Sequence, residues 1–354
     1  MSARVVVAMS GGVDSSVAAA LMVAQGHDAI GITMHLAGDA SRCCSLDDAE
    51  DARRVARTLG MPFYVAPYQD RFRSEVMEPF ADAYLSGRTP IPCVACNRRF
   101  KFHYLLERAR ALGAERIATG HYARIDADPE TGAWRLRAAV DTVKDQSYFL
   151  FDLDQQQLAR TALPLGALRK DEVRMRARAL GLATAEKPES QEICFVPGGD
   201  YARVVEQLRP DAATAGEIVD EDGRVLGRHA GIHHFTVGQR RGLRLAAGER
   251  LYVTRIEPEA GRVVVGPEAA LLVRTARLEN VSWIAGETPE EPIRACVRVR
   301  YRHEGAEATI EPDGKDGARL RFSEPVRAIA PGQAAVFYDE DVVLGGGWIC
   351  REPA

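Results

Sequence analysis

The feature that most constrains the fold is a short glycine-containing loop between a buried strand and a helix. Residues 4–9 form a valine-rich run, which is typical of a strand buried on both faces of a parallel sheet. The loop SGGVDSS follows at residues 10–16, and residues 17–25 have the composition of a helix that ends at Gly26. Glycines allow a tight turn whose N–H groups surround anionic oxygens, and the helix N-terminus adds a partial positive charge. The sequence therefore predicts an anion-binding loop at the carboxyl edge of an α/β sheet.

The rest of the first third alternates between strand-like and helix-like patterns. Strands are predicted at residues 28–36, 62–66 and 116–119, and helices at residues 46–59 and 99–112. This βαβα order predicts a doubly wound parallel sheet, because parallel strands need crossover connections.

After about residue 200 the long helical patterns end. Turn signals such as Asp222-Gly223 separate short alternating runs, and residues 318–322 and 335–338 have the pattern of antiparallel strands. We therefore predict three domains: an α/β domain at residues 1–198, a small mixed domain at residues 199–276 and a compact β-barrel at residues 277–354.

Composition narrows the class of protein. Hydrophobic residues make up 46% and charged residues 27% of the chain, which suits a soluble protein with a sizeable core. No apolar run approaches the roughly 20 residues that span a bilayer, so no membrane contact is expected. Seven cysteines are too sparse, and odd in number, for a disulfide scaffold, which favours a reducing compartment and a cytoplasmic location. The net charge of −4 argues against indiscriminate nucleic-acid binding but allows local basic patches.

The loop differs from two common nucleotide-binding fingerprints. It lacks the Gly-Lys-Ser/Thr of the Walker A loop, and it is not the G-x-G-x-x-G of dinucleotide-binding folds. It resembles the PP-loop of ATP pyrophosphatases, which split ATP into AMP and pyrophosphate and adenylate a carbonyl or amide oxygen. The alternative is an ordinary glycine-rich turn, which the preceding strand and following helix disfavour. PP-loop enzymes include amide-forming synthetases, tRNA lysidine synthetases and thiolating enzymes, so the loop alone leaves the substrate open.

The cysteines help to distinguish among these classes of PP-loop enzyme. Cys93 and Cys96 form a C-x-x-C pair, but a structural zinc site usually needs a second pair, which the sequence lacks. A thioredoxin-type dithiol would follow the first strand of its own fold, and this pair does not.

Another cysteine pair stands at positions 43 and 44. Adjacent cysteines rarely bind one metal together, and Ser45 with Asp48 predicts a capped helix start directly after them. We therefore interpret Cys43 and Cys44 as structural.

Six motifs occur in order along the chain: SGGVDSS, CVACNRRFKF, ATGHYAR, KDQSYFLF, ESQEICF and GQRRGL. Together they resemble the bacterial tRNA-specific 2-thiouridylase family, the tRNA-uridine 2-sulfurtransferases of the PP-loop ATP pyrophosphatase superfamily. The resemblance extends to the turn Pro331-Gly332-Gln333 and so covers nearly the whole chain.

This resemblance implies ATP-dependent 2-thiolation of the wobble uridine of tRNA. The uridine C2 carbonyl is a poor electrophile, and transfer of AMP to its oxygen creates a good leaving group. ATP and Mg²⁺ are therefore expected, the cation because it neutralises the pyrophosphate. The residues expected to bind the nucleotide are Ala8, Met9, Ser10, Gly11, Gly12, Val13, Asp14 and Ser15, with Met34 and Gly120 beside the adenosine.

The resemblance also assigns roles to two thiols. Cys194, in ESQEICF, would carry sulfur as a persulfide received from a sulfur-relay donor protein. Cys96 would be the nucleophile that completes the transfer, with a Cys96–Cys194 disulfide as by-product. Arg98, Arg99 and a helix N-terminus are expected to lower the pKa of Cys96. Residues 186–195 have no strong periodicity, and we expect a mobile loop that orders over the target base.

A second interpretation of the thiols stays open. Cys93, Cys96 and Cys194 could ligate a [4Fe–4S] cluster with one open iron for exogenous sulfide. Relatives with another residue at the position of Cys93 are usually described with the two-thiol route. Because this chain has a cysteine there, the cluster interpretation stays open. We favour the persulfide route.

RNA contacts are expected from local basic runs. Residues 98–124 carry seven Lys/Arg against two Glu, and residues 169–178 carry five against two acidic residues. Solvated helix faces often have this composition, but both runs lie beside the motifs. Phosphate contacts would position the tRNA while the target base leaves its stack. The resemblance assigns tRNA contacts to His121, Lys144, Asp145, Gln146, Arg300, Tyr301 and Gln333, and Arg240, Arg241 and Arg244 are further candidates.

Two other functions are compatible with the sequence. A PP-loop synthetase that adenylates a small carboxylic acid and forms an amide would release pyrophosphate without RNA, and it leaves three thiols unexplained. A non-catalytic regulator would bind ATP and tRNA and never release pyrophosphate.

Overall fold

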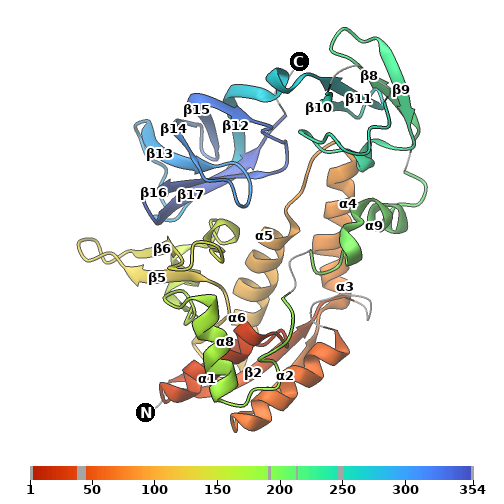
Figure 1. Ribbon diagram of the computed structural model, residues 1–354. Helices are drawn as coiled ribbons and strands as arrows, with labels where there is room; N and C mark the ends of the chain where they lie inside the picture. Colours follow the sequence, from red (N-terminus) through yellow and green to blue (C-terminus); the bar gives the residue numbers. More distant parts are fainter. Residues whose placement is uncertain (1–2, 38–44, 190–192, 213, 246–249, 352–354) are drawn as a thin grey trace.

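The structure is a computed structural model of the 354-residue chain, and it describes residues 3–37, 45–189, 193–212, 214–245 and 250–351. A five-stranded parallel sheet lies at one end of the molecule, opposite two β-rich domains (Figure 1). Its strand order is β3-β2-β1-β4-β7, with β1 Arg4–Ala8, β2 Asp28–His35, β3 Phe63–Pro67, β4 Arg116–Ala118 and β7 Thr161–Ala162. Every neighbouring pair is parallel, and β1 lies in the centre.

Helices cover both faces of this sheet because β1 alternates between two hydrophobic cores. Val5 and Val7 belong to one core, and Val6 belongs to the other. The first core is completed by α1 (Val13–Ala24), α2 (Leu46–Thr58) and α8 (Lys170–Ala179). The second is covered by two longer helical segments at residues 69–85 and 92–111. The prediction of a doubly wound parallel sheet is therefore confirmed.

Each of the two longer segments contains a π-helical stretch. The first consists of α3 (Gln69–Phe72), a π-helical stretch (Arg73–Met77) and α4 (Glu78–Leu85). The second consists of α5 (Pro92–Cys96), a π-helical stretch (Asn97–Tyr104) and α6 (Leu105–Ala111). The predicted helix start at residue 99 was wrong. Helical structure begins at Pro92, because proline suits the first turn, where its missing N–H leaves no hydrogen bond unmade.

Local side-chain caps fix other helix ends. The cap predicted for α2 is confirmed: Ser45 Oγ accepts from the Asp48 N–H at 3.1 Å, and Asp48 Oδ2 accepts from the Ser45 N–H at 3.0 Å. Cys43 and Cys44, which we interpreted as structural, lie outside the described residues. The helices that were not predicted include the segment at residues 69–85 and two short helices, α7 (Gln155–Ala159) and α9 (Tyr201–Leu208).

A small mixed domain follows the α/β domain. Its four-stranded sheet has the order β10-β11-β8-β9, in which only the β11–β8 pair is parallel. The strands are β8 Gly216–Val219, β9 Val225–His229, β10 Tyr252–Glu257 and β11 Arg262–Gly266. A core of its own, which includes Ile218, Val253 and Val263, supports it as a separate unit.

The C-terminal part closes into an antiparallel β-barrel, as predicted. The strand order is β12-β15-β14-β13-β16-β17, and pairing of β12 with β17 closes the barrel. The strands are β12 Leu272–Trp283, β13 Ile293–Arg298, β14 Ala306–Asp313, β15 Gly317–Arg327, β16 Ala334–Asp339 and β17 Val342–Ile349. The strands predicted at residues 318–322 and 335–338 lie within β15 and β16.

A hairpin from the first domain extends the sheet of the barrel. It consists of β5 (Ala123–Ala127) and β6 (Trp134–Ala138), and β6 pairs with β17. The predicted domain limit between residues 276 and 277 falls inside β12. The three predicted residue ranges stay predictions. In the described part of the chain, no helix combines the length and apolar character needed to cross a bilayer.

Candidate active site

The loop at residues 10–16 is folded tightly by its own side chains. Gly11 has a φ of +71°, and a Cβ at this position would lie 2.2 Å from the carbonyl oxygen of Asp48. Ser15 Oγ accepts from the Ser10 N–H at 3.1 Å and donates to the carbonyl oxygen of Gly12 at 3.1 Å. Ser16 Oγ donates to the same carbonyl at 2.8 Å. The loop thus begins α1 in a fixed conformation, as anion binding at a helix N-terminus requires.

The residues predicted to flank a nucleotide lie around this loop. A Cβ at Gly120 would lie 2.7 Å from the backbone nitrogen of Ser15, so the segment after β4 contacts the loop closely. Met34 is buried near the end of β2, and the preceding Thr33 Oγ1 donates to the carbonyl oxygen of Met9 at 2.6 Å. The structure therefore gathers the predicted segment 8–15, Met34 and Gly120 at the carboxyl ends of β1, β2 and β4.

Asp14 in this loop is held by two side chains that we did not predict. Lys170 Nζ donates to both carboxylate oxygens of Asp14, at 2.7 and 2.8 Å, and Tyr122 Oη donates to Oδ1 at 2.8 Å. Burial, followed by the Asp14 carboxylate, raises the pKa of Tyr122, so its hydroxyl keeps its proton. Lys170 is the first residue of α8 and also lies 2.9 Å from Glu189 Oε1.

The rarity of lysine in this sequence is a signal that could have indicated this network of ion pairs. Of the 46 basic residues only five are lysines, so a lysine in this arginine-rich chain is unusual. Three of the five make ion pairs around the loop: Lys170 with Asp14 and Glu189, Lys144 with Glu189, and Lys187 with Asp48 and Asp51. Burial opposes ionisation of Glu189, but hydrogen bonds from Lys144 and Lys170 lower its pKa to about 2.

The two cysteines of the C-x-x-C pair lie on α5. Cys93 is in its first turn and Cys96 is its last residue, so the expectation of a helix N-terminus beside Cys96 was wrong. The two neighbouring arginines also have carboxylate partners. Arg98 lies 3.7 Å from Asp152, and Arg99 lies 3.1 Å from Glu75.

The residue after Cys194 belongs to an aromatic cluster that also includes Phe100, in the π-helical stretch after α5. Phe195 packs edge-on against Phe72, with ring centroids 5.7 Å apart, and Phe72 packs edge-on against Phe100 at 5.4 Å. Cys96 and Cys194 both pack against the large hydrophobic core to which these rings belong. The predicted loop at residues 186–195 has neither helix nor strand in its described part, and residues 190–192 lie outside the described residues.

Metal-ligating side chains gather elsewhere. In the described ranges, the set of three ligand atoms within 4.8 Å of one another belongs to Glu206, His233 and His234 in the small domain. Cys93, Cys96 and Cys194 do not meet this spacing, which a single metal ion would require. The spacing does not test a [4Fe–4S] cluster, since each cysteine would bind a separate iron.

His121, a predicted tRNA contact, is buried beside the loop. Its Nε2 accepts from Lys101 Nζ at 3.2 Å, and its Nδ1–H donates to Thr119 Oγ1 at 2.7 Å. Burial and, less strongly, the Lys101 charge lower the pKa of His121 well below its usual range. The His121 imidazole is therefore neutral, and its two hydrogen bonds hold the segment after β4 in place.

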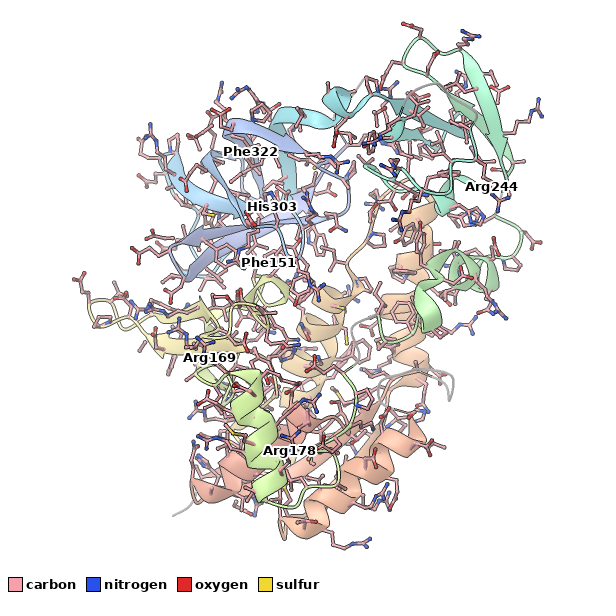
Figure 2. The ribbon with its side chains drawn as sticks, viewed as in Figure 1. Phe151, Arg169, Arg178, Arg244, His303 and Phe322 are labelled. Carbon is pink, nitrogen blue, oxygen red and sulfur yellow. The ribbon has the colours of Figure 1, made fainter. Side chains whose placement is uncertain are left out.

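The predicted contact residues 144–146 belong to a segment that joins the α/β domain to the barrel. Lys144 pairs with Glu189 at 2.5 Å, and the Gln146 side-chain oxygen accepts from the Tyr122 N–H at 3.0 Å. Asp145 is buried and accepts from Arg298 Nη1 in β13 at 2.8 Å. Further along, Phe151 packs against Trp348 of the barrel, and Figure 2 shows it between the two domains.

The remaining predicted tRNA contacts lie on the barrel. The ring of Tyr301 lies 4.5 Å from that of Phe149, and Arg300 Nη1 donates to the carbonyl oxygen of Arg327 at 3.1 Å. Gln333 Nε2 donates to the carbonyl oxygen of Thr89 at 2.9 Å, so it reaches the segment just before α5. Exposed arginines lie on both the α/β domain and the small domain: Arg169 and Arg178 at the two ends of α8, and Arg244 in the small domain (Figure 2).

Three protein-family models match consecutive parts of the chain. A tRNA methyl transferase HUP domain matches residues 3–198, a tRNA methyl transferase PRC-barrel domain matches residues 203–267, and an aminomethyltransferase β-barrel domain matches residues 273–349. The first model alone covers more than half of the chain.

Similarity to named proteins extends over the full length. The chain is 49% identical to the tRNA-specific 2-thiouridylase MnmA of Koribacter versatilis, over 99% of both chains. It is 52% identical to the protein of the same name from Acidobacterium capsulatum, over 98% of both chains. Among solved structures, a 4-thiouridine synthetase in complex with RNA and bound ATP aligns with 59% of this chain and 51% of its own, at 18% identity and a TM-score of 0.39.

Proposed function

The chain belongs to the tRNA-specific 2-thiouridylase family, and from this premise we propose that it replaces the C2 oxygen of a wobble uridine in tRNA with sulfur, at the expense of ATP. Identity near 50% over nearly the whole of both chains carries this proposal. The chain would thus act as a tRNA-uridine 2-sulfurtransferase. A cytoplasmic location fits a tRNA substrate.

The first chemical step is adenylation of the C2 oxygen. The uridine oxygen attacks the α-phosphorus of ATP, and pyrophosphate leaves. The loop at residues 10–16, with Met34 and Gly120 beside it, supports this step because its backbone N–H groups and the start of α1 suit phosphate oxygens. Mg²⁺ would neutralise the leaving pyrophosphate. Asp14 is the carboxylate of the loop, but its oxygens already accept hydrogen bonds from Lys170 and Tyr122, so its role is to hold the loop in place and the ion would be held mainly by the phosphate oxygens of ATP.

Sulfur transfer follows at the thiols. Cys194 carries a persulfide, whose terminal sulfur attacks C2 of the adenylated uridine. The Cys96 thiolate then attacks the inner sulfur of Cys194, a Cys96–Cys194 disulfide forms, and AMP leaves as the C2–sulfur double bond closes. A thiol reductant must restore both cysteines before the next turnover. This pairing is supported by the large hydrophobic core against which both Cys96 and Cys194 pack, and by the aromatic rings of Phe100 and Phe195, which belong to it.

The cluster route predicts a different role for Cys93. If Cys93, Cys96 and Cys194 held a [4Fe–4S] cluster, Cys93→Ser would lose both bound iron and thiolation. In the persulfide route Cys93 serves only the first turn of α5, and the variant keeps substantial activity. Iron, sulfide and 2-thiouridine analysis of protein purified without oxygen distinguishes the two routes.

tRNA would approach across the domains that the segment at 144–151 joins. The proposed contacts are His121, Lys144, Asp145, Gln146, Arg300, Tyr301 and Gln333. Since His121 and Asp145 are buried among protein groups, we propose that they act by holding neighbouring exposed groups in place. A sulfur-relay protein would charge Cys194.

The test is Cys194→Ser, because serine keeps the size of the side chain but cannot form a persulfide. We expect pyrophosphate release in the presence of tRNA to continue, whereas 2-thiouridine and protein-bound radioactive sulfur disappear. Cys350→Ser, a half-buried cysteine of the barrel, is the matched control and should behave as wild type. Substantial 2-thiouridine formation by Cys194→Ser would overturn the role of this thiol.

A further inference from the structure

Lys170 links the ATP loop to the segment that leads to Cys194. Its Nζ donates to both oxygens of Asp14, at 2.7 and 2.8 Å, and lies 2.9 Å from Glu189 Oε1. The Lys170 side chain is only 12% exposed, so these charges are partly shielded from solvent. Such contacts are stronger than ion pairs between freely moving surface side chains.

Glu189 has a second lysine on its other oxygen. Lys144 Nζ lies 2.5 Å from Glu189 Oε2, and Arg174 from α8 lies 3.7 Å from Oε1. Lys144 belongs to the segment that reaches the barrel and that we propose for RNA contact. One carboxylate therefore joins the ATP loop, through Lys170, with that segment.

A neighbouring ion pair holds the same stretch of chain at a second point. Lys187 Nζ lies 2.7 Å from Asp48 and 2.6 Å from Asp51, both on α2. The backbone of Asp48 is the group against which Gly11 of the loop packs. The chain leading to Cys194 is thus anchored twice, at Lys187 and at Glu189, to elements that form the ATP loop.

We propose that Glu189 is a positioning residue for sulfur transfer, which holds the segment carrying Cys194 against the ATP loop through Lys170 and against the RNA-contacting segment through Lys144. The proposal rests on the function proposed above. Glu189 lies five residues before Cys194, and Phe195 on the other side of the thiol packs against Phe72. Glu189 therefore fixes one end of the short stretch that carries the thiol, and its loss lets the thiol shift from its position. Reactive groups displaced by even 1 Å lose a large part of their rate.

The two half-reactions should respond differently to the loss of this anchor. Adenylation depends on the loop, whose hydrogen bonds through the Ser15 and Ser16 hydroxyls do not involve Glu189. Lys170, which pairs with Glu189, donates to Asp14 directly and can keep those bonds without it. Sulfur transfer requires Cys194 to reach the adenylated base, and this step depends on the anchored segment. A residue that merely supported the fold would slow both steps together.

The experiment compares Glu189→Gln with Glu186→Gln. Both variants remove one negative charge from the same segment, but Glu186 pairs with Arg178 on the exposed face of α8, where its side chain is 72% exposed. Enzyme charged with radioactive sulfur is mixed in excess with tRNA and ATP. Pyrophosphate formation reports adenylation, and label in tRNA reports sulfur transfer.

For Glu189→Gln we expect adenylation within about threefold of wild type and sulfur transfer slower by roughly tenfold or more, the size of effect that misplaced reactive groups produce. Glu186→Gln should match wild type in both steps, and Glu189→Asp should recover part of the transfer rate. Hydrogen exchange of the backbone between residues 186 and 196 should quicken in Glu189→Gln and not in Glu186→Gln.

Two results would overturn the positioning role: unchanged sulfur transfer in Glu189→Gln, or an equal slowing of adenylation and transfer. Failure of the proposed function is distinguishable, because wild-type enzyme would then form no labelled tRNA at all. If the wild type transfers label and the variant is charged equally, the comparison addresses Glu189 alone.

Discussion

Replacement of Gly11 by alanine places a methyl group where the structure has no room for one. The φ of Gly11 is +71°, in the left-handed region, and the new Cβ would lie 2.2 Å from the carbonyl oxygen of Asp48 and 2.8 Å from its carbonyl carbon. Both contacts involve the backbone at the start of α2, so no side-chain rotation relieves them. Gly60 provides a matched comparison, because its φ is +68° and its Cβ would have no neighbour within 4 Å.

The magnitude follows from these two separate effects. A left-handed conformation costs a residue with a Cβ about 1–2 kcal/mol, and overpacking adds about 1–3 kcal/mol. Gly11→Ala should therefore lower the free energy of unfolding by about 2–5 kcal/mol, and Gly60→Ala by only about 1–2 kcal/mol. If the loop relaxes to avoid the contact, part of this energy appears as weaker ATP binding, at about 1.4 kcal/mol for each tenfold loss.

Urea unfolding followed by circular dichroism measures the first quantity, and tRNA-dependent pyrophosphate release at varied ATP concentration measures the second. We expect Gly11→Ala to be less stable than Gly60→Ala, to raise the KM for ATP by roughly tenfold or more, or to show both effects. Gly60→Ala should leave the KM for ATP unchanged. Equal stability of the two variants, together with a normal KM in Gly11→Ala, would refute the packing argument.

Other predictions concern the barrel contacts and a buried acid. Burial raises the pKa of Asp152 from 3.8 to about 6, so ionisation destabilises the folded state as pH rises from about 4 to 6. Asp152→Asn should therefore be more stable than wild type by about 1–3 kcal/mol at pH 8 but not at pH 4, in urea titrations at both pH values. Asp145→Asn weakens the bond to Arg298 and should cost about 1–3 kcal/mol of unfolding free energy in the same assay. Gln333→Ala removes the hydrogen bond from the Gln333 side-chain amide to the carbonyl oxygen of Thr89. It should slow 2-thiouridine formation several-fold in single-turnover assays without changing the KM for ATP.

Features that depend on neighbouring residues were predictable from the sequence. The valine-rich run of β1 and the glycine loop after it indicate a buried strand and a tight turn over only a dozen positions. The cap of α2 likewise depends on two residues three positions apart, Ser45 and Asp48. In each case the interacting residues are close together in the sequence, so a local pattern is enough to predict the structure.

Features formed between distant segments were not predictable in the same way. Lys170 and Asp14 are 156 positions apart, and nothing in either local pattern indicates their ion pair. Pairing of β6 with β17 joins residues about two hundred positions apart, and no local pattern indicates it. The helix start at Pro92 is a different case, because proline is a local signal for the first turn of a helix and is visible in the sequence.

The most direct test of the account follows the oxygen that sulfur replaces. tRNA carrying heavy oxygen at C2 of the wobble uridine is incubated with the enzyme, ATP and a persulfide donor, and the AMP product is analysed by mass spectrometry. Adenylation of the C2 oxygen predicts that the heavy oxygen is recovered in the phosphate of AMP, in equal amount to the 2-thiouridine formed. AMP without the label, accompanied by 2-thiouridine, would contradict the account, because the oxygen would then have left without passing through an adenylated intermediate.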